Sequence, residues 1–161
     1  MFQNASKAAE LDPQNPESSV MLSTYYFFKG DFTFSQNHAE KAVELNPSNP
    51  EAYMRLGLSM IHQGDYENSE EFVRKSIEID PLDPKIVRRK IPYFFLYMGR
   101  NEFQKAFEIT KEILEHSPNA GLVKGFKASV MGFLDYGNEA KQALDEYLAV
   151  SYTHLRAHET S

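Results

Sequence analysis

One interval recurs along this chain of 161 residues and constrains its fold more than any other feature. Three Asx-Pro pairs stand 34 residues apart, at Asp12-Pro13, Asn46-Pro47 and Asp80-Pro81. A second proline keeps the same step at Pro16, Pro50 and Pro84, and Gly-Asp-aromatic turns keep it at Gly30 and Gly64. A fixed period of this length is typical of stacked helical hairpins, each of which buries its apolar face against its neighbours. The interval therefore predicts an all-α solenoid that works through a binding surface.

Residues 50–83 show how one repeat is built. Four residues at helical spacing form the inward face of a first helix, namely Tyr53, Leu56, Gly57 and Met60. Gly64-Asp65 ends this helix, because glycine readily takes the left-handed conformation found at helix ends. A second helix follows, with an inward face of Ser69, Val73, Ser76 and Ile79. The small serines predict a close approach of the two helices.

The same interval divides the rest of the chain. Residues 1–15 fit the second helix of a truncated repeat, residues 16–49 and 50–83 are regular repeats, and residues 84–120 form an irregular one. Pro92 falls in the first helix of the irregular repeat and is expected to kink or split it, because proline removes a backbone donor. Residues 121–148 read as a truncated repeat with its turn at Tyr136-Gly137-Asn138. The native sequence is thus expected to be cut off at both ends.

The last residues, 149–161, are interpreted as a non-native tail. Residues 150–160 read Val-Ser-Tyr-Thr-His-Leu-Arg-Ala-His-Glu-Thr and resemble a translated sequencing adapter, the transposase mosaic end with its primer extension. His154 and His158 have the spacing that places two imidazoles on one helix face for a metal. Because the segment is expected to be an artefact of sequencing, we reject it as a metal site.

The repeat pattern resembles the tetratricopeptide repeat family. Tyr53, Leu56-Gly57 and Pro81 fit the family's aromatic, Leu-Gly and proline positions directly. The match is strong over residues 16–83, recognisable over 1–15 and degenerate over 84–148. The resemblance implies a right-handed superhelix of antiparallel helix pairs, whose first helices line a concave groove for peptides.

The family's groove-lining positions imply a candidate binding groove in this chain. They fall on Thr24, Phe27, Phe28, Arg55, Leu58, Lys85, Arg88 and Arg89. Arginine suits bidentate carboxylate binding, and aromatic side chains act as anchors. We therefore expect the groove to hold an extended or helical peptide that carries acidic and hydrophobic residues.

Two other interpretations of these residues stay open. Phe27, Phe28 and Phe95 could pack against neighbouring helices, while Arg89 pairs with a local acid. Some members of the family instead capture a C-terminal carboxylate with five polar residues. Lys85 and Arg89 match two of those positions, whereas Val20, Thr24 and Arg55 replace the other three.

Composition argues against several other functions. The net charge of -6 disfavours general binding to nucleic acid or anionic membrane, even with the basic cluster at residues 85–90. The chain has no cysteine, which excludes disulfides and thiolate metal sites. Its longest apolar run, residues 91–98, is too short to span a membrane. Without a phosphate-binding loop, a nucleophile elbow or a His-Glu-x-x-His motif, the sequence predicts neither enzyme activity nor a cofactor, and we expect a cytoplasmic protein.

The leading interpretation is thus a non-catalytic scaffold that binds a protein or peptide. An alternative rests on the irregular repeat with its internal proline, which is similar to the C-terminal repeats of some bacterial nucleotide cyclases and winged-helix regulators. In that case an effector domain would precede the repeats. A third possibility is self-association through the open ends, because superhelices normally finish with a polar capping helix.

Overall fold

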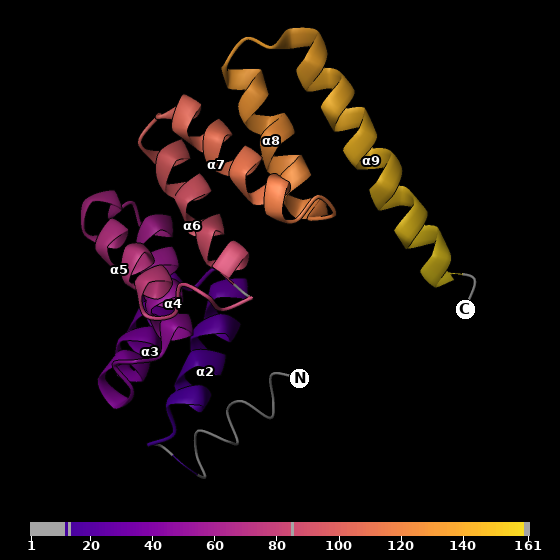
Figure 1. The fold of residues 1–161 in the computed structure, drawn as a ribbon. Helices are drawn as coiled ribbons and strands as arrows, with labels where there is room; N and C mark the ends of the chain where they lie inside the picture. Colours follow the sequence, from indigo (N-terminus) through magenta and orange to yellow (C-terminus); the bar gives the residue numbers. More distant parts are fainter. Residues whose placement is uncertain (1–11, 13, 85, 160–161) are drawn as a thin grey trace. The chain divides into compact units, whose positions relative to one another are not determined.

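The structure is a computed structural model that describes the backbone of residues 12, 14–84 and 86–159, and side chains up to residue 148. Within these ranges the chain is all-α (Figure 1). The helices are α2 (Pro16–Phe28), α3 (Phe32–Leu45), α4 (Pro50–His62), α5 (Tyr66–Glu78), α6 (Ile86–Gly99), α7 (Phe103–His116), α8 (Gly121–Phe133) and α9 (Gly137–Glu159). The predicted all-α arrangement of consecutive helical hairpins is confirmed. Three parts of the predictions lie outside the described residues. They are Lys85, most of residues 1–15 and the side chains of the adapter-like segment 150–160.

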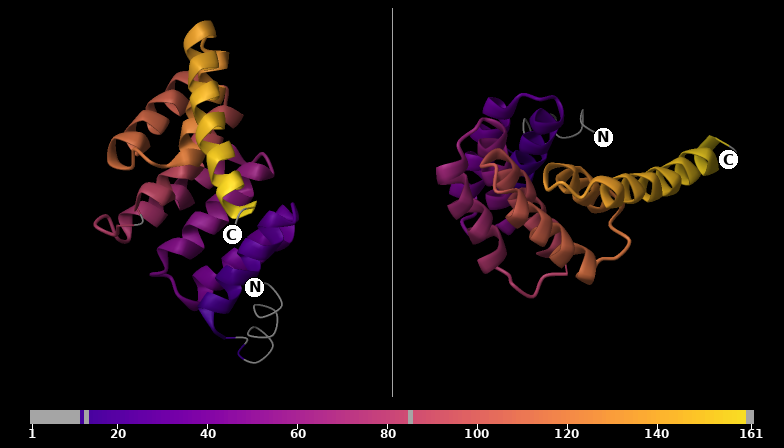
Figure 2. Two further views of the ribbon diagram at one scale, coloured as in Figure 1. Left: turned by 90° about the vertical axis from the view of Figure 1, so that its right-hand side faces the viewer. Right: turned by 90° about the horizontal axis from the view of Figure 1, so that it is seen from above.

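The chain divides into two compact units, Met1–Pro92 and Tyr93–Ser161, with the boundary inside α6. In the first unit, α2 pairs with α3 and α4 pairs with α5, while α4 also contacts α2 and α3. In the second unit, α8 contacts both α7 and α9, and α9 runs alongside α8 (Figure 2). Thus α4 and α8 each pack against their own hairpin partner and against the preceding second helix.

Side-chain caps fix where the first four described helices, α2 to α5, begin. The Asn49 side-chain oxygen accepts hydrogen bonds from the N–H groups of Glu51 (3.0 Å) and Ala52 (3.3 Å), and Pro50 follows at the first helical position. Asn15 caps α2 in the same way, while Asp31 and Asp65 cap α3 and α5. These short polar side chains satisfy backbone donors that would otherwise lack a partner at a helix start.

One left-handed residue closes each hairpin turn. It is Gly30 (φ 78°) or Gly64 (φ 87°) in the first two hairpins, and Asn101 (φ 60°) or Asp135 (φ 62°) in the last two. Asparagine and aspartate tolerate this conformation better than other residues with side chains, since their short polar side chains can form local hydrogen bonds. The turn predicted at Tyr136-Gly137-Asn138 is therefore wrong by about two residues, because Gly137 already begins α9.

The turn residues also locate the irregularity of the third hairpin. Gly64 and Asn101 are 37 residues apart, three more than the regular step. The extra residues lie before α6, since residues 79–85 join α5 to α6 whereas residues 46–49 join α3 to α4. Pro92 lies inside α6, which the structure shows as one helix from Ile86 to Gly99 and not as two. Within α6 the repeat register is thus 37 residues, which places Arg88 at the position of Glu51.

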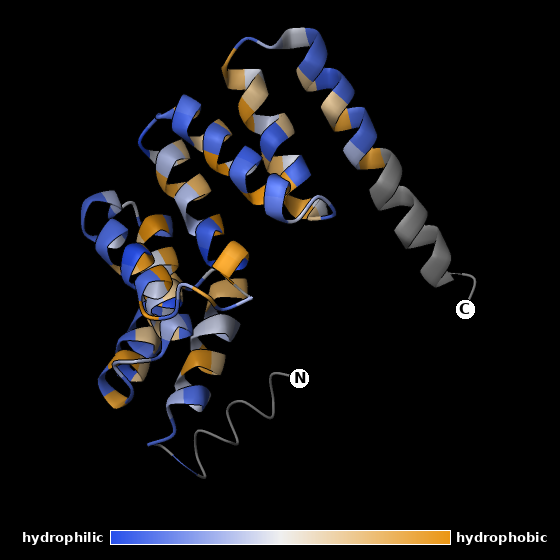
Figure 3. Cartoon of the chain, viewed as in Figure 1, coloured by the Kyte–Doolittle hydropathy of each residue, from blue (hydrophilic) through white to orange (hydrophobic). Residues whose placement is uncertain are grey.

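Small buried residues let the paired helices approach closely. The inward faces of the second helices are fully buried at Ser35, Ala39, Ala42, Ser69, Val73, Ser76, Ala106 and Thr110. A Cβ on Gly57 would lie 2.7 Å from Val73 Cγ2 and 3.1 Å from the Val73 backbone nitrogen, so a larger residue would force α4 and α5 apart. Ile79 is exposed and not inward as predicted, because α5 ends at Glu78. Hydrophilic residues predominate along α5 (Figure 3).

Candidate partner-binding face

The candidate binding face of the first unit centres on one stripe of α4. Glu51, Arg55, Leu58 and His62 recur at steps of four, three and four residues. These steps place them one above another on a single face of an α-helix. The stripe is flanked by α2 on one side and by the start of α6 on the other, so it is a surface to which three first helices contribute.

A charged cluster occupies the N-terminal end of this stripe. Arg55 Nε lies 3.3 Å from Glu51 Oε1, and Arg88 of α6 pairs with Glu51 Oε2. The Arg55 side chain is only 10% exposed, and its Nε makes no hydrogen bond to the described residues. Burial lowers the pKa of Arg55, Glu51 opposes this, and the positive charge of Arg88 adds to the lowering. Two guanidinium groups thus share one carboxylate, which leaves an excess positive charge.

Aromatic side chains occupy the opposite end of the stripe. The His62 ring lies 4.8 Å from Phe27 and 4.9 Å from Phe32, measured between ring centroids. Phe28 packs edge-on against Phe27 at 5.9 Å and remains 72% exposed. His62 Nδ1 bonds the Leu58 carbonyl oxygen at 2.9 Å, which fixes the ring against its own helix. This end is an apolar surface with one large ring open to solvent.

The structure brings most of the predicted site residues to this face. Thr24 is half-buried and donates a hydrogen bond to the Val20 carbonyl oxygen, and Leu58 is buried between the two ends of the stripe. Lys85 lies outside the described residues. Arg89 takes the buried position of Ala52, where its side chain is 3% exposed and pairs with Asp83, as the alternative interpretation expected.

Glu51 is the site residue that sequence reasoning missed. It is an acid in the first turn of α4, and it also links Arg55 to Arg88. The 37-residue register of α6 would have revealed this pairing, because only this register sets Arg88 beside Glu51. The same register removes Arg89 from the position that the carboxylate clamp requires.

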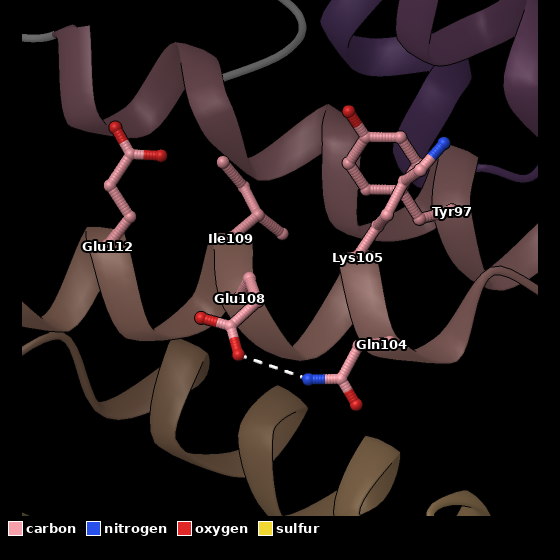
Figure 4. Close-up of a pocket in the computed structure, with 6 residues that line it drawn as sticks. All are labelled: Tyr97, Gln104, Lys105, Glu108, Ile109 and Glu112. Carbon is pink, nitrogen blue, oxygen red and sulfur yellow. Dashed lines mark hydrogen bonds between the residues drawn. The ribbon is translucent and has the colours of Figure 1, made fainter.

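The second unit has an open pocket of about 420 Å³ between α6 and α7. Tyr97 of α6 and five residues of α7 line it, including Glu108, which accepts a hydrogen bond from Gln104 at 3.1 Å (Figure 4). Glu108 also pairs with Lys111 at 3.0 Å. Of the two acids that line the pocket, Glu108 is therefore already bonded within α7.

Two further features concern the described part of the chain. No group of three or more His, Cys, Asp or Glu side chains is arranged to hold a metal ion there. None of the described helices combines the length and the apolar composition needed to cross a membrane.

Comparison with known proteins agrees with this architecture. Residues 20–84 match a tetratricopeptide repeat family model. Among curated proteins, no relative matches the chain. A tetratricopeptide repeat protein from Parabacteroides merdae has a similar structure, with a TM-score of 0.76 and 16% identity over 92% of this chain. The chain spans 57% of that protein's length.

Two further solved structures show the same likeness. A thermophilic tetratricopeptide repeat protein from Thermus thermophilus gives a TM-score of 0.79 at 16% identity, covering 92% of this chain and 80% of its own. A chain of the APC/C hetero-tetramer Cut9–Hcn1 gives 0.77 at 16% identity, covering 94% of this chain and 30% of its own. At such identities the likeness concerns the fold. Residues 20–84 therefore match tetratricopeptide repeats, and the chain has the all-α hairpin fold of proteins built from such repeats.

Proposed function

We propose that this chain is a non-catalytic interaction module that binds an acidic and apolar peptide segment of a partner protein. The binding surface is the face formed by α2, α4 and the start of α6 in the first unit. The fold supports this role, because tetratricopeptide repeat proteins are generally non-catalytic scaffolds. One structural relative is a chain of the APC/C hetero-tetramer Cut9–Hcn1.

The observation that carries the proposal is the sharing of Glu51 by Arg55 and Arg88. Each guanidinium can donate several hydrogen bonds in a fork that matches a carboxylate, and one carboxylate cannot satisfy two such groups. Arg55 is also largely removed from water, so an additional carboxylate nearby would interact with it more strongly than at an exposed site. A partner side chain that supplies this carboxylate fits the charge of the cluster.

The charges of the surrounding helices favour an acidic ligand at the same face. The part of α6 in the first unit carries no acidic residue and three basic ones, of which only Arg89 is buried and paired with Asp83. The second helix α5, by contrast, carries four glutamates and two basic residues. Complementary potential of this kind steers encounter and fixes the register of a bound partner.

Selection from a displayed library of random dodecapeptides tests the proposal. We expect enrichment of peptides that combine acidic and large apolar residues, with affinity measured by fluorescence anisotropy on the purified protein. Arg88→Gln should weaken the selected peptides at least tenfold. The matched control is Arg74→Gln on α5, which removes an arginine paired with Glu78 elsewhere on the same unit. Peptides that bind Arg88→Gln and wild type equally would refute the proposed site.

A further inference from the structure

The two ends of the α4 stripe lie a fixed distance apart. Glu51 and His62 are eleven residues apart, which corresponds to about 16 Å along the helix axis, and Arg55 is about 10 Å from His62. The guanidinium of Arg55 is drawn towards Glu51, because the two side chains form an ion pair. The charged cluster therefore lies roughly 10–16 Å from the aromatic end, measured along α4.

The ends also differ in the chemistry that they can recognise. The Arg55–Glu51–Arg88 cluster has a surplus of hydrogen-bond donors and positive charge. The Phe27–Phe28–His62 group offers apolar ring surface, with Phe28 the most exposed of its rings. Between them, Leu58 and Thr24 carry no charge. The stripe thus has a polarity, with an acid-binding end, a neutral middle and an apolar end.

We propose that the binding face recognises two side chains of the partner, one acidic and one aromatic. These two residues stand four positions apart in an extended segment of the partner. This inference rests on the proposed function of the same face. An extended chain advances about 3.3 Å per residue, so four residues span about 13 Å, within the distance between the two ends. Side chains alternate between the two sides of an extended chain, so residues i and i+4 point the same way. Separations of three or five residues would direct one of the two side chains away.

The test uses acetylated and amidated peptides in which one Glu and one Phe stand two to six positions apart in a Ser/Thr background. Capped ends leave Glu as the only carboxylate. We expect the i, i+4 peptide to bind wild type at least tenfold more tightly than the i, i+3 and i, i+5 peptides. The Arg88→Glu variant should bind a peptide with Lys in place of Glu more tightly than it binds the Glu peptide. Phe28→Ser should abolish the distinction between Phe and Ala in the i+4 position.

Controls separate this inference from the proposed function. Arg74→Glu should leave every affinity unchanged, and Arg88→Gln removes the charge without placing a second carboxylate beside Glu51. If affinities depend on Arg88 but not on the separation between Glu and Phe, the inference about two recognised side chains is wrong, whereas the proposed binding face is still supported. The same conclusion follows if no peptide of the series binds while library-selected peptides bind through Arg88. If no affinity depends on Arg88, the proposed function itself fails.

Discussion

The turn between α4 and α5 needs glycine at position 64 because of the backbone conformation there, and not because space is short. Its φ of 87° is left-handed, and a Cβ built on it would meet no atom within 4 Å. An L side chain in this conformation costs about 1–2 kcal/mol. We therefore expect Gly64→Ala to lower the free energy of unfolding by about 1–2 kcal/mol, measured by urea denaturation.

Gly132 provides the matched control for this change. It also has open space around its Cβ position, but it lies in the right-handed helix α8. Alanine has the higher helix propensity, so Gly132→Ala should stabilise the protein by up to about 1 kcal/mol. Substitutions of the same kind are thus expected to have opposite signs. Equal effects at the two positions would show that φ does not determine the cost.

His38 links stability to pH. Its ring stacks on Tyr26 with centroids 5.4 Å apart, and burial, with a smaller contribution from Lys41, lowers the pKa of His38 below its ordinary value. As pH falls through about 6.5, the unfolded chain binds a proton before the folded chain does, so folding becomes less favourable. The loss is complete once the pH is below the folded pKa. Urea titrations between pH 8 and 5 should show this loss in wild type and a smaller one in His38→Gln; equal losses would contradict the assignment.

At the scale of the elements, one buried hydroxyl joins three helices. Ser35 of α3 donates to the Ser23 carbonyl oxygen of α2 at 2.9 Å, and its oxygen lies 3.1 Å from Ser23 Oγ and 2.7 Å from Ser59 Oγ of α4. All three serines are fully buried. Ser35→Ala would leave the Ser23 hydroxyl without this partner, so we expect a loss of about 1–3 kcal/mol in the free energy of unfolding.

Ser69 is the corresponding residue of the next repeat, 34 positions later, and serves as the control. Its hydroxyl donates to the Tyr66 carbonyl oxygen within α5 at 3.2 Å. Ser69→Ala should therefore change the free energy of unfolding by less than about 0.5 kcal/mol, since alanine also favours the helix. The double change Ser23→Ala and Ser35→Ala should recover part of the loss, because it removes both partners. A similar cost at Ser35 and Ser69 would contradict a role in joining helices.

The helical hairpins were predictable because their boundaries depend on local chemistry. Asn-Pro before a helix and Gly-Asp after one act through backbone bonds that lie within a few residues, so the sequence shows them directly. Asp135 closes the turn between α8 and α9 without a glycine. The sequence pattern therefore placed this turn at the nearby Gly137, two residues too late. The register of α6 could not be read from Pro84, because a loop absorbs three residues without changing the helices around it.

The candidate site was less predictable, because it depends on pairs of side chains from different helices. The resemblance to tetratricopeptide repeats implied that Phe27, Arg55 and Leu58 belong to one face. The pairing of Arg88 with Glu51, 37 residues away, and the burial of Arg89 beside Asp83 follow from the packing of α6. Such choices between nearby acids are made by tertiary structure and have no local sequence signal.

Over the whole chain, charge is distributed unevenly between first and second helices. The net charge is -6, yet α6 and α8 contain basic residues and no acidic ones. The acidic residues are prominent on second helices such as α5, with its four glutamates. A polyanion would thus be repelled by the chain as a whole, whereas a short acidic peptide interacts mainly with the face that it contacts.

This distribution predicts that the basic cluster at residues 85–90 will not bind nucleic acid. Arg89 is buried and paired with Asp83, so it is not available to a phosphate backbone. We expect a 20-nucleotide single-stranded DNA to show no anisotropy change with up to 100 μM protein at 0.15 M salt, a range in which non-specific DNA-binding proteins bind with dissociation constants of about 10⁻⁴–10⁻⁶ M. The library-selected acidic peptides should bind in the same buffer. DNA binding that weakens with Arg88→Gln and with added salt would instead assign this face to nucleic acid, because release of counterions gives such binding a steep dependence on salt.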